Sequence, residues 1–181
     1  MPLLDHPDAK AFVLHWGEMG THWGVNRSVA QIHALLYLAD QPLTAEAIVD
    51  RLRLARSNVS TALRELQGYG IVRRVHVDGD RRDHFLAETD LWEMLLRITA
   101  ERKRREIDPT IVLLRELSER LAADPDAPAH LRQRIGRLHE FMGTLGGWYD
   151  QMRGLPKPTL VGLMKLGGKV ARFLPGAKIK G

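Results

Sequence analysis

Apolar residues recur three or four positions apart along the first fifty residues, which is the period of an amphipathic α-helix. The pattern predicts three helices, and each follows a residue whose side chain can accept a hydrogen bond from a backbone N–H of the first turn: Asp8, Ser28 and Thr44. Gly24 and Pro42 end the first two helices. The chain therefore begins as a cluster of short helices.

Residues 54–86 add a fourth helix and a hairpin. At 100° per residue, one side of the helix is apolar, with Val59, Ala62, Leu63 and Leu66, and the other carries Ser57, Ser60, Thr61, Arg64 and Gly68. Ser57 can cap this helix, and Gly70 can supply its left-handed end. The segments IVRRVHV and RDHFLAE flank Asp78-Gly79, a dipeptide suited to a tight turn, and predict a two-stranded wing.

The chain becomes helical again after the hairpin. Asp90 can cap a helix that ends in the charge run ERKRRE before Asp108-Pro109, and a further helix precedes the link ADPDAP. A long helix follows the link, and its apolar positions alternate steps of four and three: Leu131, Ile135, Leu138, Met142, Leu145, Tyr149 and Met152. Such a seam needs a second helix, from the same chain or from another subunit, and we favour a dimer interface. The glycines of GTLGGW within it indicate close helix packing or a kink.

Composition allows a folded domain with a helical extension. The chain has 181 residues, of which 44% are hydrophobic and 27% charged, and its net charge is +5. This charge favours an acidic partner such as nucleic acid or an anionic membrane surface. Cysteine is absent, the first residues lack the pattern of a signal peptide, and no apolar run is long enough to span a membrane. We therefore expect a cytoplasmic protein.

The fourth helix has the properties of a DNA-reading element. Its polar face is small enough to enter a major groove, and Arg64 could bind guanine or a phosphate. At the hairpin tip, an arginine could enter a minor groove while an aspartate orients it; the alternative is a solvated tip with incidental ion pairs. From residue 51 to residue 83 there are eight arginines and four acids, an excess that predicts a steep dependence of DNA affinity on salt.

The run SNVSTALRELQGYGIVRR and the tip DGDRRDHF carry a resemblance to a known family. The chain resembles MarR-type winged helix-turn-helix transcriptional regulators, and in detail the GbsR-like branch, over residues 8–152 and most specifically over 44–85. The resemblance implies a mainly α fold with a small β-hairpin wing and a helical dimerisation region. It also implies a homodimer that binds a pseudo-palindromic operator in double-stranded DNA, most simply as a repressor.

By this resemblance the fourth helix enters the major groove, and Arg81 or Arg82 enters the minor groove. The expected DNA-binding residues are Arg56, Ser57, Asn58, Ser60, Thr61, Arg64, Arg73, Arg81 and Arg82. The expected divisions are an N-terminal helix within the dimerisation region (1–27), the winged helix-turn-helix (28–89), the remaining dimerisation region (90–152) and a basic tail (153–181). The sequence has no nucleophile elbow, phosphate-binding glycine loop or thiol, so we expect no enzyme and no cofactor.

Four tryptophans suggest a ligand site. Some GbsR-like regulators are associated with the metabolism of choline or related osmolytes, and aromatic faces bind quaternary ammonium groups. A cage could therefore form from Trp16, Trp23, Trp92 and Trp148. The alternative is that Trp16 and Trp23 belong to the apolar face of a core helix. His15, His22 and His33 lack the spacing of a metal site, and we expect no bound metal.

The basic tail supports a competing function. Leu163, Leu166, Val170, Phe173 and Leu174 would share one side of a helix, and Lys165, Lys169 and Arg172 another. Such a helix fits an anionic membrane, or it packs on a partner subunit with its lysines in water, which we favour. In this alternative the protein would attach to a membrane or a partner through the tail and the seam.

Overall fold

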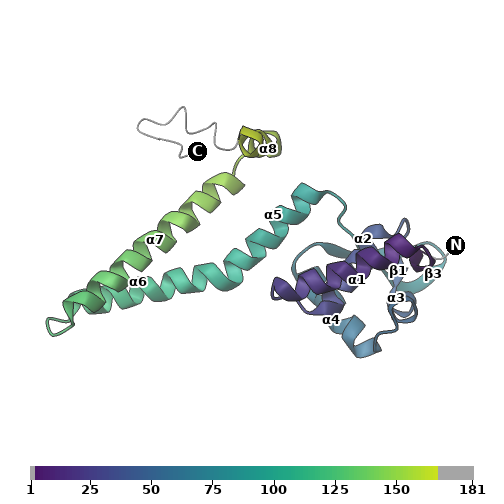
Figure 1. Ribbon diagram of the computed structural model, residues 1–181, viewed down its shortest axis with the longest axis horizontal. Helices are drawn as coiled ribbons and strands as arrows, with labels where there is room; N and C mark the ends of the chain where they lie inside the picture. The colour runs from purple at the N-terminus through teal and green to yellow at the C-terminus, as the bar shows by residue number, and fades with distance from the viewer. Residues whose placement is uncertain (1–2, 167–181) are drawn as a thin grey trace. The chain divides into compact units, whose positions relative to one another are not determined.

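The computed structural model describes residues 3–166. The chain divides after Glu101 into two compact units. The first unit contains a 3-10 turn η1 (Leu3–Asp5), four helices and a small sheet before the start of α5 (Leu91–Arg102). The helices are α1 (Pro7–His22), α2 (Arg27–Leu38), α3 (Ala45–Leu52) and α4 (Arg56–Gly68) (Figure 1).

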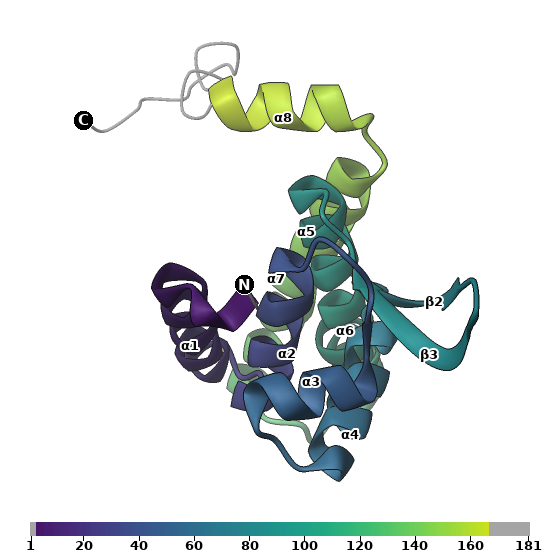
Figure 2. The same cartoon turned by 90° about the vertical axis from the view of Figure 1, so that its right-hand side faces the viewer.

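The sheet has three antiparallel strands in the order β1-β3-β2, with β1 at Leu43–Thr44, β2 at Val72–Val77 and β3 at Asp80–Ala87. β2 and β3 form the predicted hairpin, which projects from the helices (Figure 2). Its tip is the predicted Asp78-Gly79 turn, because Val77 pairs with Asp80 and Gly79 has a φ of 79°. The predicted two-stranded wing is present, and a third strand that the sequence did not predict joins it, because Leu43 pairs with Phe85 and Thr44 with His84.

One core holds the first unit together. The buried side of α4, made by Val59, Ala62, Leu63 and Leu66, packs with apolar residues of α2, α3 and the sheet. Ile32, Leu35, Ile48 and Val59 are among the residues with almost no exposed surface. Burial of these side chains is the dominant stabilising contribution, and it fixes α4 so that its opposite side faces solvent.

Three of the predicted caps are wrong. His6 Nδ1 accepts a hydrogen bond from the backbone N–H of Asp8 (3.2 Å), so α1 begins before Asp8, and Asn26 Oδ1 accepts one from Ser28 (2.9 Å) at the start of α2. α4 begins at Arg56 without a side-chain cap, which places Ser57 within its first turn. Thr44 and Asp90 are confirmed as caps, since their side chains accept backbone N–H bonds from Ala47 (3.2 Å) and Trp92 (2.9 Å).

The second unit contains a π-helical turn η2 (Lys103–Ile107), α6 (Asp108–Ala123), α7 (Ala129–Arg153) and α8 (Lys157–Leu166). α6 and α7 pack against each other. A Cβ at Gly146 would lie 2.9 Å from Ile111 Cδ1, which confirms the predicted close packing at one glycine of GTLGGW. Lys103 Nζ contacts carboxylate oxygens of Asp108 (2.6 Å) and Asp150 (3.2 Å), and these partners raise its pKa.

The predicted seam of α7 is only partly buried. Ile135, Met142 and Tyr149 are partly buried. Large apolar side chains elsewhere on the helix remain exposed, at Leu131, Leu138, Phe141, Leu145 and Trp148. We call these five residues the α7 stripe. Among residues 3–166, α6 packs against α7 but leaves the stripe exposed.

No described helix is both long and apolar enough to cross a membrane. Much of the amphipathic tail predicted from the sequence, including Val170, Phe173 and Leu174, lies outside the described residues.

Candidate nucleic-acid interface

The solvent-facing side of α4 is polar along its length. Every α4 residue predicted to contact DNA is exposed: Arg56, Ser57, Asn58, Ser60, Thr61 and Arg64. Arg64 donates a hydrogen bond from Nη2 to Thr61 Oγ1 (3.3 Å), so its guanidinium group lies along the helix surface. Arg56 forms an ion pair with Glu46 of α3 (3.1 Å). The helix therefore presents hydroxyl, amide and guanidinium groups, which are the groups that bind base edges and phosphates.

A cluster of charged side chains holds Arg82 at the hairpin. Arg82 donates hydrogen bonds from its guanidinium group to both carboxylate oxygens of Asp80, and Arg82 Nε lies 2.9 Å from Asp80 Oδ1. These bonds lower the pKa of the Asp80 carboxyl group well below its usual range. His84, almost fully buried, lies behind the pair, with Nε2 at 3.5 Å from Asp80 and Nδ1 at 3.0 Å from the carbonyl oxygen of Arg82.

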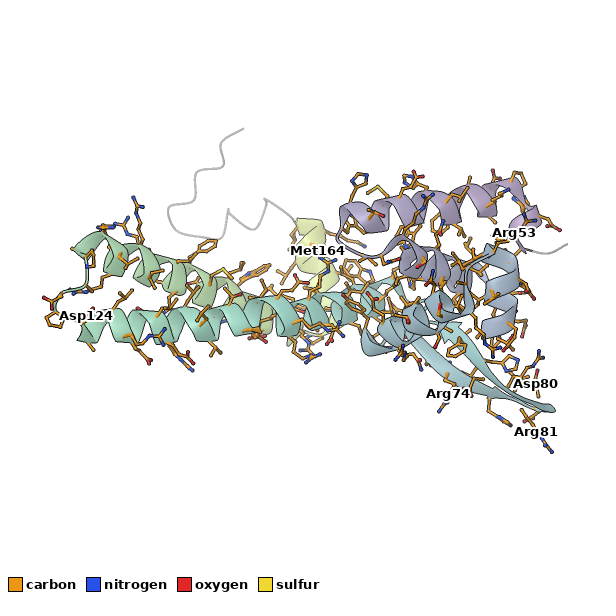
Figure 3. All side chains as sticks on the ribbon, turned by 90° about the horizontal axis from the view of Figure 1, so that it is seen from below. Arg53, Arg74, Asp80, Arg81, Asp124 and Met164 are labelled. Atoms are coloured by element: carbon orange, nitrogen blue, oxygen red, sulfur yellow. The ribbon has the colours of Figure 1, made fainter. Side chains whose placement is uncertain are left out.

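The remaining hairpin arginines differ in their partners. Arg74 Nη1 contacts Asp83 Oδ2 at 3.1 Å across the two strands. Arg73 and Arg81 are exposed, and neither forms an ion pair with any residue from 3 to 166. Arg81 extends outward beside the hairpin tip (Figure 3). It is therefore open to an external anion, whereas Arg82 is held in one orientation by Asp80.

α4 and the hairpin enclose an open groove of about 440 Å³. Four arginines and two acids line it: Arg56, Arg64, Arg74, Arg82, Glu46 and Asp83. Sequence reasoning had not selected Arg74 or Glu46. Neighbouring residues of a strand point to opposite faces, so Arg74 lines the groove while the predicted Arg73 does not. The sequence IVRRVHV predicts that Arg73 and Arg74 point to opposite faces of the strand. Which of the two faces the groove depends on the position of α4.

Comparison with known proteins connects this arrangement to a family. Residues 23–83, which include α2 to α4 and most of the hairpin, match the model of the MarR family. Residues 23–83 therefore form a MarR-family helix-turn-helix domain. The similarity of this domain to transcriptional regulators supports the expectation that the protein is not an enzyme.

The chain is similar to two curated proteins of Bacillus subtilis (strain 168). It is 19% identical to the HTH-type transcriptional repressor GbsR over 156 residues, covering 84% of this chain and 83% of GbsR. It is 23% identical to the HTH-type transcriptional repressor OpcR over 127 residues, covering 66% of this chain and 69% of OpcR. These similarities confirm the resemblance to the GbsR-like branch.

A solved structure confirms the fold. The crystal structure of a transcriptional regulator aligns with a TM-score of 0.63 and 23% sequence identity, covering 82% of this chain and 97% of that one. The mainly helical fold with a winged helix-turn-helix is therefore confirmed. The division of the chain into four functional regions stays a prediction.

The protein has a second candidate site in its first unit. Phe12, Trp16, His33, Ala34, Tyr37, Leu91 and Met94 line a mostly apolar pocket of about 200 Å³. His33 is 5% exposed, and its Nε2 atom has no hydrogen-bond partner among residues 3–166. Burial lowers the pKa of His33 to about 4, so its ring is neutral at pH 7.

The structure brings only part of the predicted tryptophan cage to this pocket. Trp16 lines it and stacks on Phe12 at 5.4 Å between ring centroids. Trp23 contacts Trp16 edge-on at 5.9 Å but does not line the pocket. Trp92 does not line it either, and Trp148 belongs to the second unit. Within residues 3–166, no group of three or more histidine or acidic side chains could hold a metal ion.

Proposed function

We propose that this regulator binds a pseudo-palindromic operator in double-stranded DNA as a homodimer and represses transcription. The observation that carries the proposal is the exposed polar face of α4 beside a groove lined by four arginines. In this proposal α4 enters the major groove, with Arg64 at base edges, and Arg81 or Arg82 enters the adjacent minor groove. The names of GbsR and OpcR support repression rather than activation. Such a role would place the protein in the cytoplasm.

The α7 stripe supports the proposed homodimer. Its residues are apolar and between 40% and 62% exposed, and Leu131, Leu138 and Leu145 repeat every seven residues. A second copy would present the same stripe, and two such helices can pack by inserting side chains between one another. A dimer would place two α4 helices on two half-sites of the operator.

Fluorescence anisotropy tests the proposed function. The full chain is titrated onto labelled DNA from its own upstream region and onto scrambled DNA of equal length, at two salt concentrations. We expect tighter binding to the upstream DNA and a steep loss of affinity at the higher salt, because lysine and arginine contacts release counterions from the DNA. Equal weak binding to both DNAs would contradict sequence-specific regulation.

Replacing Asp80 by asparagine tests the role of the hairpin. The change removes a negative charge, so electrostatics alone would raise DNA affinity. We expect the opposite, an operator affinity about threefold to tenfold lower, because Arg82 loses the carboxylate that orients it. Asp78→Asn at the same turn is the matched control, since Asp78 is exposed. If both variants raise affinity equally, Asp80 does not position Arg82 for DNA.

The pocket at His33 supports a response to a small molecule. Its aromatic residues, Phe12, Trp16 and Tyr37, could contact a quaternary ammonium group, and the neutral ring of His33 would not repel it. The free Nε2 atom could bind a hydroxyl group of the same molecule. We propose that a choline-like compound binds here and changes the separation of the two α4 helices, which would alter operator affinity.

Choline and 3,3-dimethylbutan-1-ol test this effector proposal, because they have nearly the same shape and differ in charge. Each is added to the complex of the regulator with its operator, and anisotropy reports DNA release. Release by choline alone would support a cation bound by aromatic faces. Release by neither, or equally by both, would contradict the proposed preference for quaternary ammonium.

Burial of His33 predicts a pH dependence of stability. The pKa is about 4 in the folded protein against 6.5 for an unburied histidine. The unfolded chain therefore binds the proton more tightly, and the free energy of unfolding falls as the pH decreases from about 6.5 to about 4, by up to about 3 kcal/mol. Urea unfolding at several pH values measures this change. His33→Gln should flatten the dependence in this window, whereas His15→Gln, at an exposed position, should not.

A further inference from the structure

The turn between α3 and α4 contains an unusual backbone conformation. Arg53 ends α3 with φ 53° and ψ 41°, and it is the one non-glycine residue with positive φ among residues 3–166. The left-handed conformation brings a Cβ atom too close to the backbone, and glycine or asparagine occupies it more readily. Arg53 is thus a locally unfavourable residue in this turn, and backbone strain of this kind is typical of functional sites.

The surroundings of Arg53 leave its charge available. Arg51, Arg53 and Lys10 line an open groove of about 460 Å³, together with the carboxylates of Asp5 and Asp50. Arg51 and Arg53 are exposed. Within the part of the chain that the structure describes, neither guanidinium group lies within 4 Å of a carboxylate, as the ion pairs of Arg27, Arg56 and Arg74 do. Both groups can therefore bind an anion outside the chain.

Arg53 and the hairpin lie on different sides of α4. Arg53 lines a groove with residues of α1 and α3, whereas Arg74 and Arg82 of the hairpin line a different groove with residues of α3 and α4. Figure 3 shows Arg53 on the side of the unit that bears α1, away from Arg81 at the hairpin tip. A helix inserted in the major groove has a phosphate backbone along each edge of the groove. Arg53 is placed to meet the backbone that the hairpin does not reach.

We propose that Arg53, with Arg51 beside it, binds DNA phosphates on the side of α4 opposite to the hairpin. The inference rests on the proposed function, because it assumes that α4 enters the major groove. It adds a basic contact outside the α4 face and the hairpin. Because phosphates are the same at every position, this contact adds affinity without sequence preference.

Arg53→Gly tests the effect of the backbone conformation on stability and the effect of the side chain on DNA binding by separate measurements. Glycine relieves the left-handed strain, so we expect the melting temperature to rise by about 2–4 °C. The lost phosphate contact should raise the dissociation constant about threefold to tenfold, equally for operator and scrambled DNA. It should also reduce the slope of log affinity against log salt by about one per lost contact. Arg53→Asn, which also tolerates this conformation, should behave in the same way.

Two controls complete the experiment. Arg53→Lys keeps a cation and should retain most of the affinity and salt slope of the original protein. Arg27→Gln removes an exposed arginine at the start of α2 and should change neither. Unchanged affinity and salt slope in Arg53→Gly would overturn the proposal, as would a loss confined to the operator. If the unaltered protein fails to bind its operator, the proposed function itself fails.

Discussion

Replacing Leu138 by glutamate is expected to convert the protein to a monomer and to lower its affinity for a two-half-site operator by about a hundredfold or more. Leu138 is 46% exposed in the middle of the α7 stripe. In the proposed dimer this position is buried against the second copy, where an unpaired carboxylate would be strongly unfavourable. Two linked binding events typically exceed a single one by 10² to 10⁴ in affinity, and a monomer loses this gain.

Sedimentation velocity and anisotropy on a full operator measure the two parts of this result. Gln133→Glu is the matched control, because it adds the same charge at another exposed position of α7. The α-helical circular dichroism of both variants should equal that of the original protein. A Leu138→Glu variant that stays dimeric and binds DNA normally would show that the stripe is not the interface between subunits.

Replacing Arg64 by alanine is expected to remove most of the discrimination between operator and unrelated DNA. Arg64 is exposed on α4, and its contact within the described chain is the 3.3 Å bond to Thr61, which a DNA base could replace. A bidentate arginine contact to guanine is worth about 1–3 kcal/mol, or about tenfold to a hundredfold in affinity at each half-site. Binding to scrambled DNA should change much less.

Arg64→Lys distinguishes base reading from simple charge. Lysine keeps the positive charge but lacks the planar fork of donors, so we expect it to restore binding to scrambled DNA and only part of the preference for the operator. Equal losses on both DNAs in Arg64→Ala, fully restored by lysine, would identify Arg64 as a phosphate contact. No change in either variant would mean that this face of α4 does not enter the groove.

Local pattern was sufficient for several elements. The apolar spacing of Val59, Leu63 and Leu66 determined both the existence of α4 and the direction that its polar face takes. Asp78-Gly79 specified the hairpin turn, because glycine takes a positive φ without strain. The resemblance to MarR-type regulators rested on this same short region, and the family match covers it.

The capping residues of α1, α2 and α4 could not be predicted from the local sequence pattern. Polar residues that can accept a hydrogen bond stand on either side of the starts of α1 and α2, and Ser57 lies just inside α4. The first residue of each helix depends on where its apolar face packs against the core, so α2 starts after Asn26 and α4 after Ala55. The two-residue strand β1 was also not predicted from the sequence, because it is too short to show an alternating pattern.

The sequence by itself determined the helix-turn-helix, the hairpin and the polar composition of the face that α4 presents, because each depends on residues close together in the chain. Only the tertiary structure decided which arginines share a groove, which side of α7 stays uncovered and that His33 is buried without a partner for Nε2. Arg74 and Glu46, for example, lie 28 positions apart and line one groove. Such neighbours depend on how separate elements pack, and a periodic pattern within one element does not determine that packing.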